Sequence, residues 1–121
     1  MEKILLVQVG ASEISQIKKL AENKGIRVIS ASEKSAGCRM EELVMGKSRE
    51  AGSDRKEAGL PKHSLMVFCD VSDKHFEKLL FEMRSKKIAI DYKAVLTETN
   101  RNWTLERLYM ELEKERIMMG R

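Results

Sequence analysis

Two continuous apolar runs stand out from the rest of the chain. Residues 4–9 read Ile-Leu-Leu-Val-Gln-Val, and residues 65–70 read Leu-Met-Val-Phe-Cys-Asp. Apolar residues without alternation are typical of β-strands that are covered on both faces. We therefore predict two central strands, one near the start of the chain and one near its middle.

A helical spacing of apolar residues follows each run. Ser12 is predicted to cap the first helix, and Gly25 supplies the left-handed residue that ends it. Ser72 is predicted to cap the second helix, with an acidic residue in its first turn. The inward positions recur at a period near 3.6 residues: Ile14, Ile17, Leu20 and Ala21, then Phe76, Leu79, Leu80 and Met83.

Two further strands are more polar, as edge strands are. Residues 26–30 restart a strand directly after the first helix. In residues 88–97 alternate positions are apolar, which predicts a strand with one covered face. The residues that would share this face are Ile88, Ile90, Tyr92, Ala94 and Leu96.

Two more helices complete the pattern. Residues 39–45 predict a short helix, and Asn102 is predicted to cap a longer helix at the end of the chain. Their inward faces are apolar: Met40, Leu43 and Val44 in the first, then Leu105, Leu108, Tyr109 and Leu112 in the second.

The resulting order, β-α-β-(α)-β-α-β-α, indicates an α/β fold. We predict a single domain, residues 1–121, with three layers around a four-stranded, mostly parallel sheet of order 2-1-3-4. A ferredoxin-like α+β sandwich with an extra C-terminal helix is the alternative, because it also places strands one and three centrally. A flexible charged loop at about 46–63 would separate a β-α-β half from a β-α-β-α half.

Composition narrows the classes of function. The 23 basic and 19 acidic side chains are mixed along the chain, so the net charge of +4 does not indicate a nucleic-acid partner. Cys38 and Cys69 are far apart and are predicted to be free thiols in a reducing compartment. The start of the chain does not read as a signal peptide, and no run approaches about 20 apolar residues, which predicts a cytoplasmic protein.

Polar residues follow the predicted strands where α/β proteins bind their ligands. In a parallel sheet the carboxyl ends of the strands lie along one edge. We therefore expect a polar crevice for a small ligand, formed by Ser12, Asp70, Thr97, Thr99 and Asn100. In the ferredoxin-like alternative Ser12 would move to the far edge, whereas Asp70 and Thr97 would stay together.

Asp70 and Thr97 also resemble the phosphoacceptor arrangement of response-regulator receiver domains. They would be the aspartate after strand three and the threonine after strand four. The acidic pair that holds the metal after strand one is missing, because only Glu13 is acidic there, and no fifth strand supplies a lysine. Glycine-rich nucleotide motifs are absent, and His63 and His75 lack partners at a recognisable spacing, so no metal or cofactor is predicted.

Large apolar residues on second helix faces predict burial on two sides or a partner surface. Trp103, Met110 and Ile117 are spaced by seven residues, about 140° from the stripe that begins at Leu105. Phe81 also points away from the stripe of its own helix. The partner could be another protein or a second copy of the chain. Alternatively, Trp103 packs the start of the last helix against the sheet.

The second half of the chain carries a recognisable combination of motifs. A strand and capped helix around Asp70 and Phe76 are followed by Lys-Ala-Val-Leu-Thr at 93–97, Asn-Arg-Asn-Trp-Thr at 100–104 and a leucine pattern ending at Leu112. Over about residues 65–115 the chain resembles a small bacterial family known as domain of unknown function DUF3783. The resemblance implies a bacterial cytoplasmic protein and no particular activity. Its signature positions would be Lys93, Thr97, Asn100, Trp103 and Thr104.

These features together predict a non-enzymatic, regulatory module that binds a small ligand or another protein. The polar residues after the strands and the second apolar helix faces motivate this interpretation. The alternative is a receiver-like phosphoacceptor or an enzyme centred on Asp70 and Thr97.

Overall fold

Four strands and four α-helices form the described part of the chain, residues 1–46 and 60–118 of a computed structural model. The strands are β1 (Lys3–Val7), β2 (Arg27–Ala31), β3 (Leu65–Cys69) and β4 (Tyr92–Val95). The helices are α1 (Ala11–Glu22), α2 (Met40–Val44), α3 (Asp73–Ser85) and α4 (Leu105–Met118), with 3-10 turns η1 (Glu33–Ser35) and η3 (Asn100–Asn102). None of these helices combines the length and the apolar character needed to cross a membrane.

The four strands form one sheet of order β2-β1-β3-β4, which confirms the predicted order. β1 is parallel to β2 and β3 is parallel to β4, but β1 and β3 are antiparallel. The sheet is therefore mixed: two parallel pairs meet in an antiparallel centre. The predicted common edge for all strand ends is wrong, because β1 ends where β3 begins.

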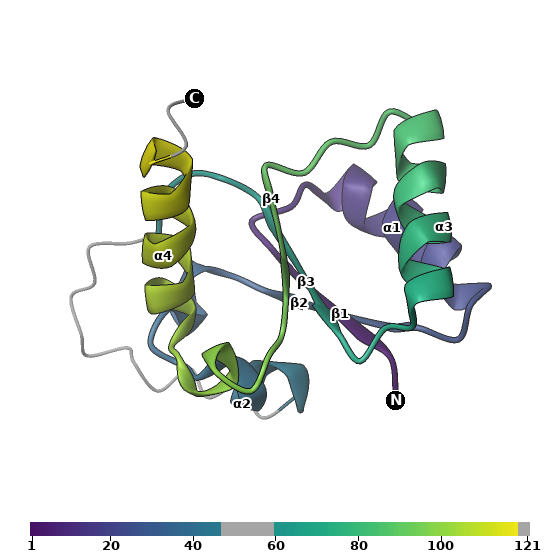
Figure 1. Cartoon of the computed structure of the whole chain (residues 1–121). Helices are drawn as coiled ribbons and strands as arrows, with labels where there is room; N and C mark the ends of the chain where they lie inside the picture. The colour runs from purple at the N-terminus through teal and green to yellow at the C-terminus, as the bar shows by residue number, and fades with distance from the viewer. Residues whose placement is uncertain (47–59, 119–121) are drawn as a thin grey trace.

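Helices cover both faces of the sheet, so the predicted three-layer α/β architecture is confirmed (Figure 1). Alternate residues of the two central strands point to opposite faces. One set packs with α1 and α3: Ile4, Leu6, Met66 and Phe68. The other set packs with α2 and α4: Leu5, Val7, Leu65 and Val67. Burial on both faces explains why these strands are apolar at every position.

The two halves of the chain repeat the same elements around an internal two-fold axis. In the antiparallel pair Leu5 lies opposite Val67, 62 residues further along the chain. The same spacing relates Gln8 (φ 57°) and Asp70 (φ 59°), which follow β1 and β3 with left-handed backbone. It also relates the left-handed residues that follow α1 and α3: Gly25 (φ 70°) and Lys87 (φ 58°).

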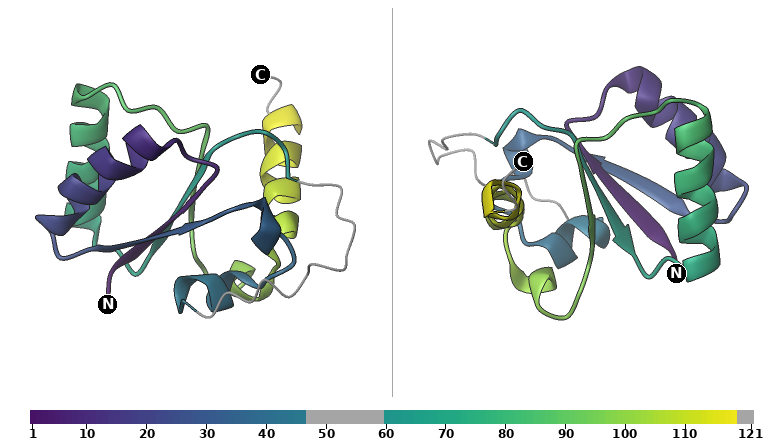
Figure 2. Two further views of the ribbon diagram at one scale, coloured as in Figure 1. Left: turned by 180° about the vertical axis from the view of Figure 1, so that it is seen from behind. Right: turned by 45° about the horizontal axis from the view of Figure 1, so that its top comes forward.

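A second pair of equivalent contacts joins the starts of α2 and α4, which lie on the same side of the sheet (Figure 2). The Met40 N–H donates to the Trp103 carbonyl at 2.8 Å, and the Leu105 N–H donates to the Cys38 carbonyl at 2.9 Å. Met40 and Leu105 are 65 residues apart, because three additional residues, 89–91, precede β4. The chain therefore folds like two copies of one β-α-β-α unit.

The caps of α1 and α3 differ in how well the sequence predicted them. Ser72 caps α3 as predicted, since its hydroxyl accepts the His75 N–H at 3.2 Å. The predicted cap of α1 is wrong: Gly10 is the N-cap, and Ser12 lies inside the first turn. Gly10 corresponds to Ser72 under the 62-residue spacing, so the repeat of the fold places the N-cap of α1 two residues before Ser12.

The last helix and the strand before it also begin later than predicted. Thr104, rather than Asn102, caps α4, because its hydroxyl accepts the Arg107 N–H at 3.1 Å. β4 is shorter than the predicted 88–97, and the single covered face predicted for its apolar residues is wrong. Ile88 and Ile90 precede the strand and pack on the α1–α3 side, whereas Tyr92 packs on the α2–α4 side.

Part of the predicted loop at 46–63 belongs to the packed fold. Leu60 is buried in the core between the sheet and α4. The Pro61 and His63 carbonyls accept hydrogen bonds from Gln8. Residues 47–59 lie outside the described residues.

Candidate functional site

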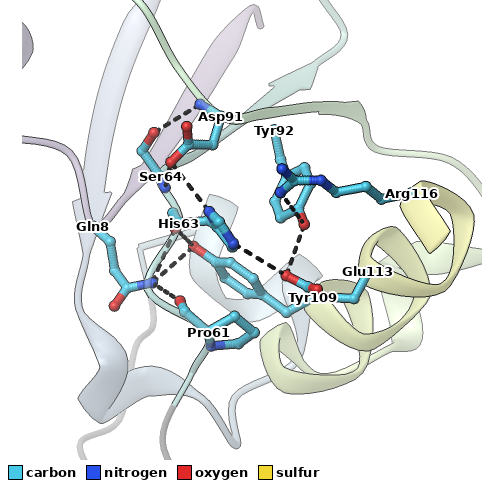
Figure 3. Close-up of polar contacts among 9 residues, drawn as sticks. All are labelled: Gln8, Pro61, His63, Ser64, Asp91, Tyr92, Tyr109, Glu113 and Arg116. Atoms are coloured by element: carbon cyan, nitrogen blue, oxygen red, sulfur yellow. Dashed lines mark hydrogen bonds and ion pairs between the residues drawn. The ribbon is translucent and has the colours of Figure 1, made fainter. Parts of the chain in front are cut away.

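A cleft of about 420 Å³ opens at the edge of the sheet where β1 ends and β3 and β4 begin. Six polar side chains line it: Gln8, Glu13, Lys62, His63, Ser64 and Asp91. Figure 3 shows four of them beside residues of α4. The antiparallel centre of the sheet creates this site, because it brings the end of the first half to the start of the second.

Gln8 ties the end of β1 to the segment before β3. Its Nε2 donates to the Pro61 carbonyl at 2.7 Å and to the His63 carbonyl at 3.1 Å, and lies 3.2 Å from the Tyr109 hydroxyl (Figure 3). Left-handed backbone is unfavourable for residues with a Cβ atom. The three side-chain contacts of Gln8 offset this cost.

Tyr109 supports the same segment from α4. Its side chain is fully buried, and its hydroxyl donates to the His63 carbonyl at 2.7 Å. Burial raises the pKa of Tyr109 to about 12, because the phenolate would lose its hydration. The hydroxyl is therefore a fixed hydrogen-bond donor at neutral pH.

The His63 ring lies between two carboxylates. Its Nδ1 is 3.5 Å from Asp91 Oδ2, and its Nε2 is 3.6 Å from Glu113 Oε2 (Figure 3). A protonated ring would pair with both and would link the start of β4 to α4. The two ring nitrogens therefore face two different carboxylates.

Within residues 1–46 and 60–118, no group of His, Cys, Asp and Glu side chains could hold a metal ion.

Asp91 and Ser64 exchange hydrogen bonds at the start of β3 and β4. The Ser64 N–H donates to Asp91 Oδ2 at 3.0 Å, and the Asp91 N–H donates to Ser64 Oγ at 2.8 Å. The Ser64 N–H, together with the nearby His63 ring, lowers the pKa of Asp91. The Asp91 carboxylate is therefore charged at neutral pH where it borders the cleft.

Tyr92 holds the second carboxylate in place. Its hydroxyl donates to Glu113 Oε2 at 2.7 Å and accepts from Arg116 at 3.5 Å. Burial raises the pKa of Tyr92, so this hydroxyl also stays protonated at neutral pH. Both nitrogens of the His63 ring thus have a protein carboxylate beside them, and the residue also borders the cleft.

Glu13 and Lys62 bring opposite charges to the mouth of the cleft. Glu13 lies in the first turn of α1, and its carboxylate lies close against Gly10. A Cβ atom at Gly10 would be 2.5 Å from Glu13 Oε1, so a larger residue at this position would displace the end of the Glu13 side chain. Lys62 is exposed. The cleft therefore combines two carboxylates, Glu13 and Asp91, with two basic groups.

The five residues predicted to form a ligand crevice lie at opposite edges of the sheet. Ser12 follows β1, whereas Asp70, Thr97, Thr99 and Asn100 follow β3 and β4, which run the other way. A separate groove of about 310 Å³ is lined by Asp70 together with Phe76 and Val95. Ligand binding by these five residues stays a prediction.

Asp70 follows a buried thiol. Its Oδ2 lies 3.9 Å from Cys69 Sγ, and burial together with the Asp70 charge raises the pKa of Cys69. The thiol is therefore protonated and weakly nucleophilic at neutral pH. Cys38 and Cys69 form no disulfide, as predicted.

Thr97 and Asn100 close the turn after β4. The Thr97 N–H donates to Asn100 Oδ1 at 2.8 Å, the Asn100 N–H donates to Thr97 Oγ1 at 3.1 Å, and Asn100 Nδ2 donates to the Val95 carbonyl at 3.0 Å. Both side chains of this turn are engaged with the backbone. The contacts assign Asn100 a structural role in the family signature.

Asn100→Ala should lower the free energy of unfolding by about 1 kcal/mol, because it removes hydrogen bonds at both ends of the turn. Thr99→Ala, at the exposed neighbouring position, is the matched control and should change it by less than about 0.5 kcal/mol. Urea denaturation measures both. An unchanged Asn100→Ala stability together with lost ligand binding would assign Asn100 to a binding site instead.

The predicted interaction residues do not form one patch. Phe81 on α3 and Met110 on α4 are 63% and 57% exposed, but their helices lie on opposite faces of the sheet (Figure 1). Trp103 is half-buried against the α2–α4 core, with the Arg107 guanidinium 4.6 Å from its ring centroid. The side chain of Ile117 lies outside the described residues. A homodimer stays a prediction.

The fold and the cleft define an α/β protein of two related β-α-β-α halves with a charged site at their junction. Residues 64–119 match the family model described as Domain of unknown function (DUF3783). The predicted resemblance is thus confirmed, and it covers the half that contains β3, α3, β4 and α4. No curated protein and no solved structure gives a significant match to the chain.

Sequence reasoning did not find the residues that build the cleft. His63 and Asp91 are 28 positions apart, and Gln8 contacts Tyr109 across 101 positions. No local spacing could relate these residues, because the antiparallel pairing of β1 and β3 brings them together. One available signal was Gly10 directly after an apolar strand, which marks the wall of the cleft.

Proposed function

We propose that the protein is a non-enzymatic module that binds a small zwitterionic molecule of the α-amino-acid class in the cleft beside α1. The observation that carries the proposal is the charge pattern of the cleft. Glu13 and Asp91 suit an ammonium group, and Lys62, which lines the cleft beside His63, suits a carboxylate. A ligand that carries an ammonium group and a carboxylate on the same carbon atom can pair with the acidic and the basic side of the cleft at once.

The size and position of the cleft support this proposal. About 420 Å³ is within the range of pockets that bind small molecules. The cleft lies where the carboxyl end of β1 meets the start of α1, which is the usual ligand position in α/β proteins. The hydrogen bonds of Gln8 and Tyr109 fix the backbone of His63 without a ligand, so little ordering is needed on binding.

The family resemblance implies the bacterial cytoplasm as the setting, and a regulatory role there is part of the proposal. The proposal needs no reacting group. Asp91 is held by Ser64, and the His63 ring lies beside Asp91, Glu113 and Tyr92. These contacts position charges for recognition of a ligand.

Calorimetric titration with a panel of the common α-amino acids tests the proposal. We expect at least one amino acid to bind. Two analogues of it, the amine that lacks the carboxylate and the carboxylic acid that lacks the ammonium group, should each bind at least about 10-fold more weakly. Glu13→Gln should weaken binding about 10-fold, because it removes a charged partner of the ammonium group. A panel in which no amino acid binds at millimolar concentration would refute the proposal.

Glu98→Gln is the matched control for Glu13→Gln. Glu98 is exposed and lies in the turn after β4, at the opposite edge of the sheet from the cleft. The control should bind as the wild type does. An equal loss of binding in both variants would attribute the effect to net charge rather than to the cleft.

A further inference from the structure

The internal two-fold axis implies a second position equivalent to the cleft. The 62-residue spacing relates Ser64 to Glu2, Gly10 to Ser72, and Glu13 to His75. The Tyr92 N–H donates to the Ser64 carbonyl at 2.9 Å, and the Arg27 N–H donates to the Glu2 carbonyl at 3.0 Å. The walls of the cleft therefore have counterparts at the other edge of the sheet, at the start of α3.

A carboxylate fills this second position. Glu2 Oε2 accepts the Ser72 N–H at 2.8 Å, and both Glu2 oxygens lie within 2.9 Å of His75 Nδ1. The side chain of Glu2 is 20% exposed. The Ser72 N–H, and then the His75 ring, lower the pKa of Glu2. The side chain binds as a free carboxylate would bind between a helix start and an imidazole.

We infer that the fold contains two ligand positions related by its internal axis, and that Glu2 is a built-in ligand that occupies the one at α3. At the cleft beside α1, the residue that corresponds to Glu2 is Ser64. Its side chain is too short to fill the position, so this cleft stays open. Residues 89–91, the three additional residues of the second half, also line the cleft and have no counterpart at the α3 position.

The two positions differ in the charge that they accept. His75 at the α3 position corresponds to Glu13 at the cleft. A carboxylate is therefore the group that the α3 position takes, whereas an ammonium group suits the corresponding wall of the cleft. The α3 position is thus a carboxylate site, and a small monocarboxylate should bind there once the Glu2 side chain is removed.

Glu2→Ala tests this inference with acetate, which replaces the Cγ carbon and the carboxylate that the substitution removes. We expect acetate to shift the Ser72 amide resonance saturably and to raise the melting temperature of Glu2→Ala by about 3 °C more than equimolar chloride does. In the wild type and in Glu77→Ala, an exposed position on α3, acetate and chloride should act alike. Glu2→Gln keeps the space filled and should also show no acetate effect.

Two other results of the acetate experiment would overturn the inference. If Glu2→Ala is unfolded in chloride, acetate must restore its fold, and a variant that stays unfolded in acetate overturns the inference. A Ser72 resonance that acetate does not move, or moves equally in the wild type, overturns it too. The test uses the α3 position alone, so it stands or fails independently of amino-acid binding in the cleft.

Discussion

Gln8→Leu should lower the free energy of unfolding by about 2 kcal/mol, because it removes one of the two donors of the Pro61 carbonyl and one of the two donors of the His63 carbonyl. Leucine carries a Cβ atom as glutamine does, so the left-handed backbone at φ 57° is comparably unfavourable for both, and the change tests the amide. Urea denaturation, with the slope checked for constancy, measures the effect.

Asp70→Leu is the matched control, since Asp70 has the equivalent position in the second half and the same backbone conformation, φ 59°. Its carboxylate contacts only the Cys69 thiol among the contacts that the structure describes, so we expect a loss of less than about 1 kcal/mol. Equal losses at both positions would mean that backbone strain, rather than the Gln8 amide, dominates the effect.

Tyr109→Phe should lower the free energy of unfolding by about 1–2 kcal/mol, because the buried hydroxyl donates to the His63 carbonyl. Tyr92→Phe, which removes the hydroxyl at the rim of the site, should cost at most about 1 kcal/mol. A larger loss for Tyr92→Phe would mean that the Glu113 contact, rather than the buried one, holds α4 against the cleft.

Alkaline titration gives an independent measurement of Tyr109. Its pKa in the folded protein, about 12, exceeds the ordinary value of 10.0. The neutral form is therefore the one that folding favours, and this contribution to stability is complete below pH 10.0 and is lost as the pH rises through about 12. Absorbance of tyrosinate should show this late ionisation in the wild type, and Tyr109→Phe should lack it.

The internal two-fold axis gives one explanation for the family match, the cleft and the Glu2 contact. The matched residues, 64–119, contain one β-α-β-α unit, and residues 1–46 contain the same order of elements. The two units pair through β1 and β3, which are antiparallel. The end of each of these strands therefore lies beside the start of the other, and both units contribute a wall to the site at that point. Equivalent positions differ in charge and size: Glu2 corresponds to Ser64, and His75 corresponds to Glu13.

The sequence by itself determined the elements and their layers. Continuous apolar runs in β1 and β3 predicted burial on both faces, and the polar flanking strands predicted the edges; the order β2-β1-β3-β4 confirms both. These features depend on residues that are close in the chain, because the period of side chains along a strand or helix is local. The Asn100 signature is equally local, and its contacts are those of a turn.

Only the tertiary structure decided the direction of the second half and, with it, the site. The order of the strands is compatible with either direction of β3 relative to β1, and the hydrophobic pattern does not distinguish the two directions. The antiparallel centre moved Ser12 away from Asp70 and brought Gln8, His63 and Asp91 together instead. Contacts such as Gln8 to Tyr109, 101 positions apart, depend on that single choice of direction, which is why no spacing in the sequence could predict them.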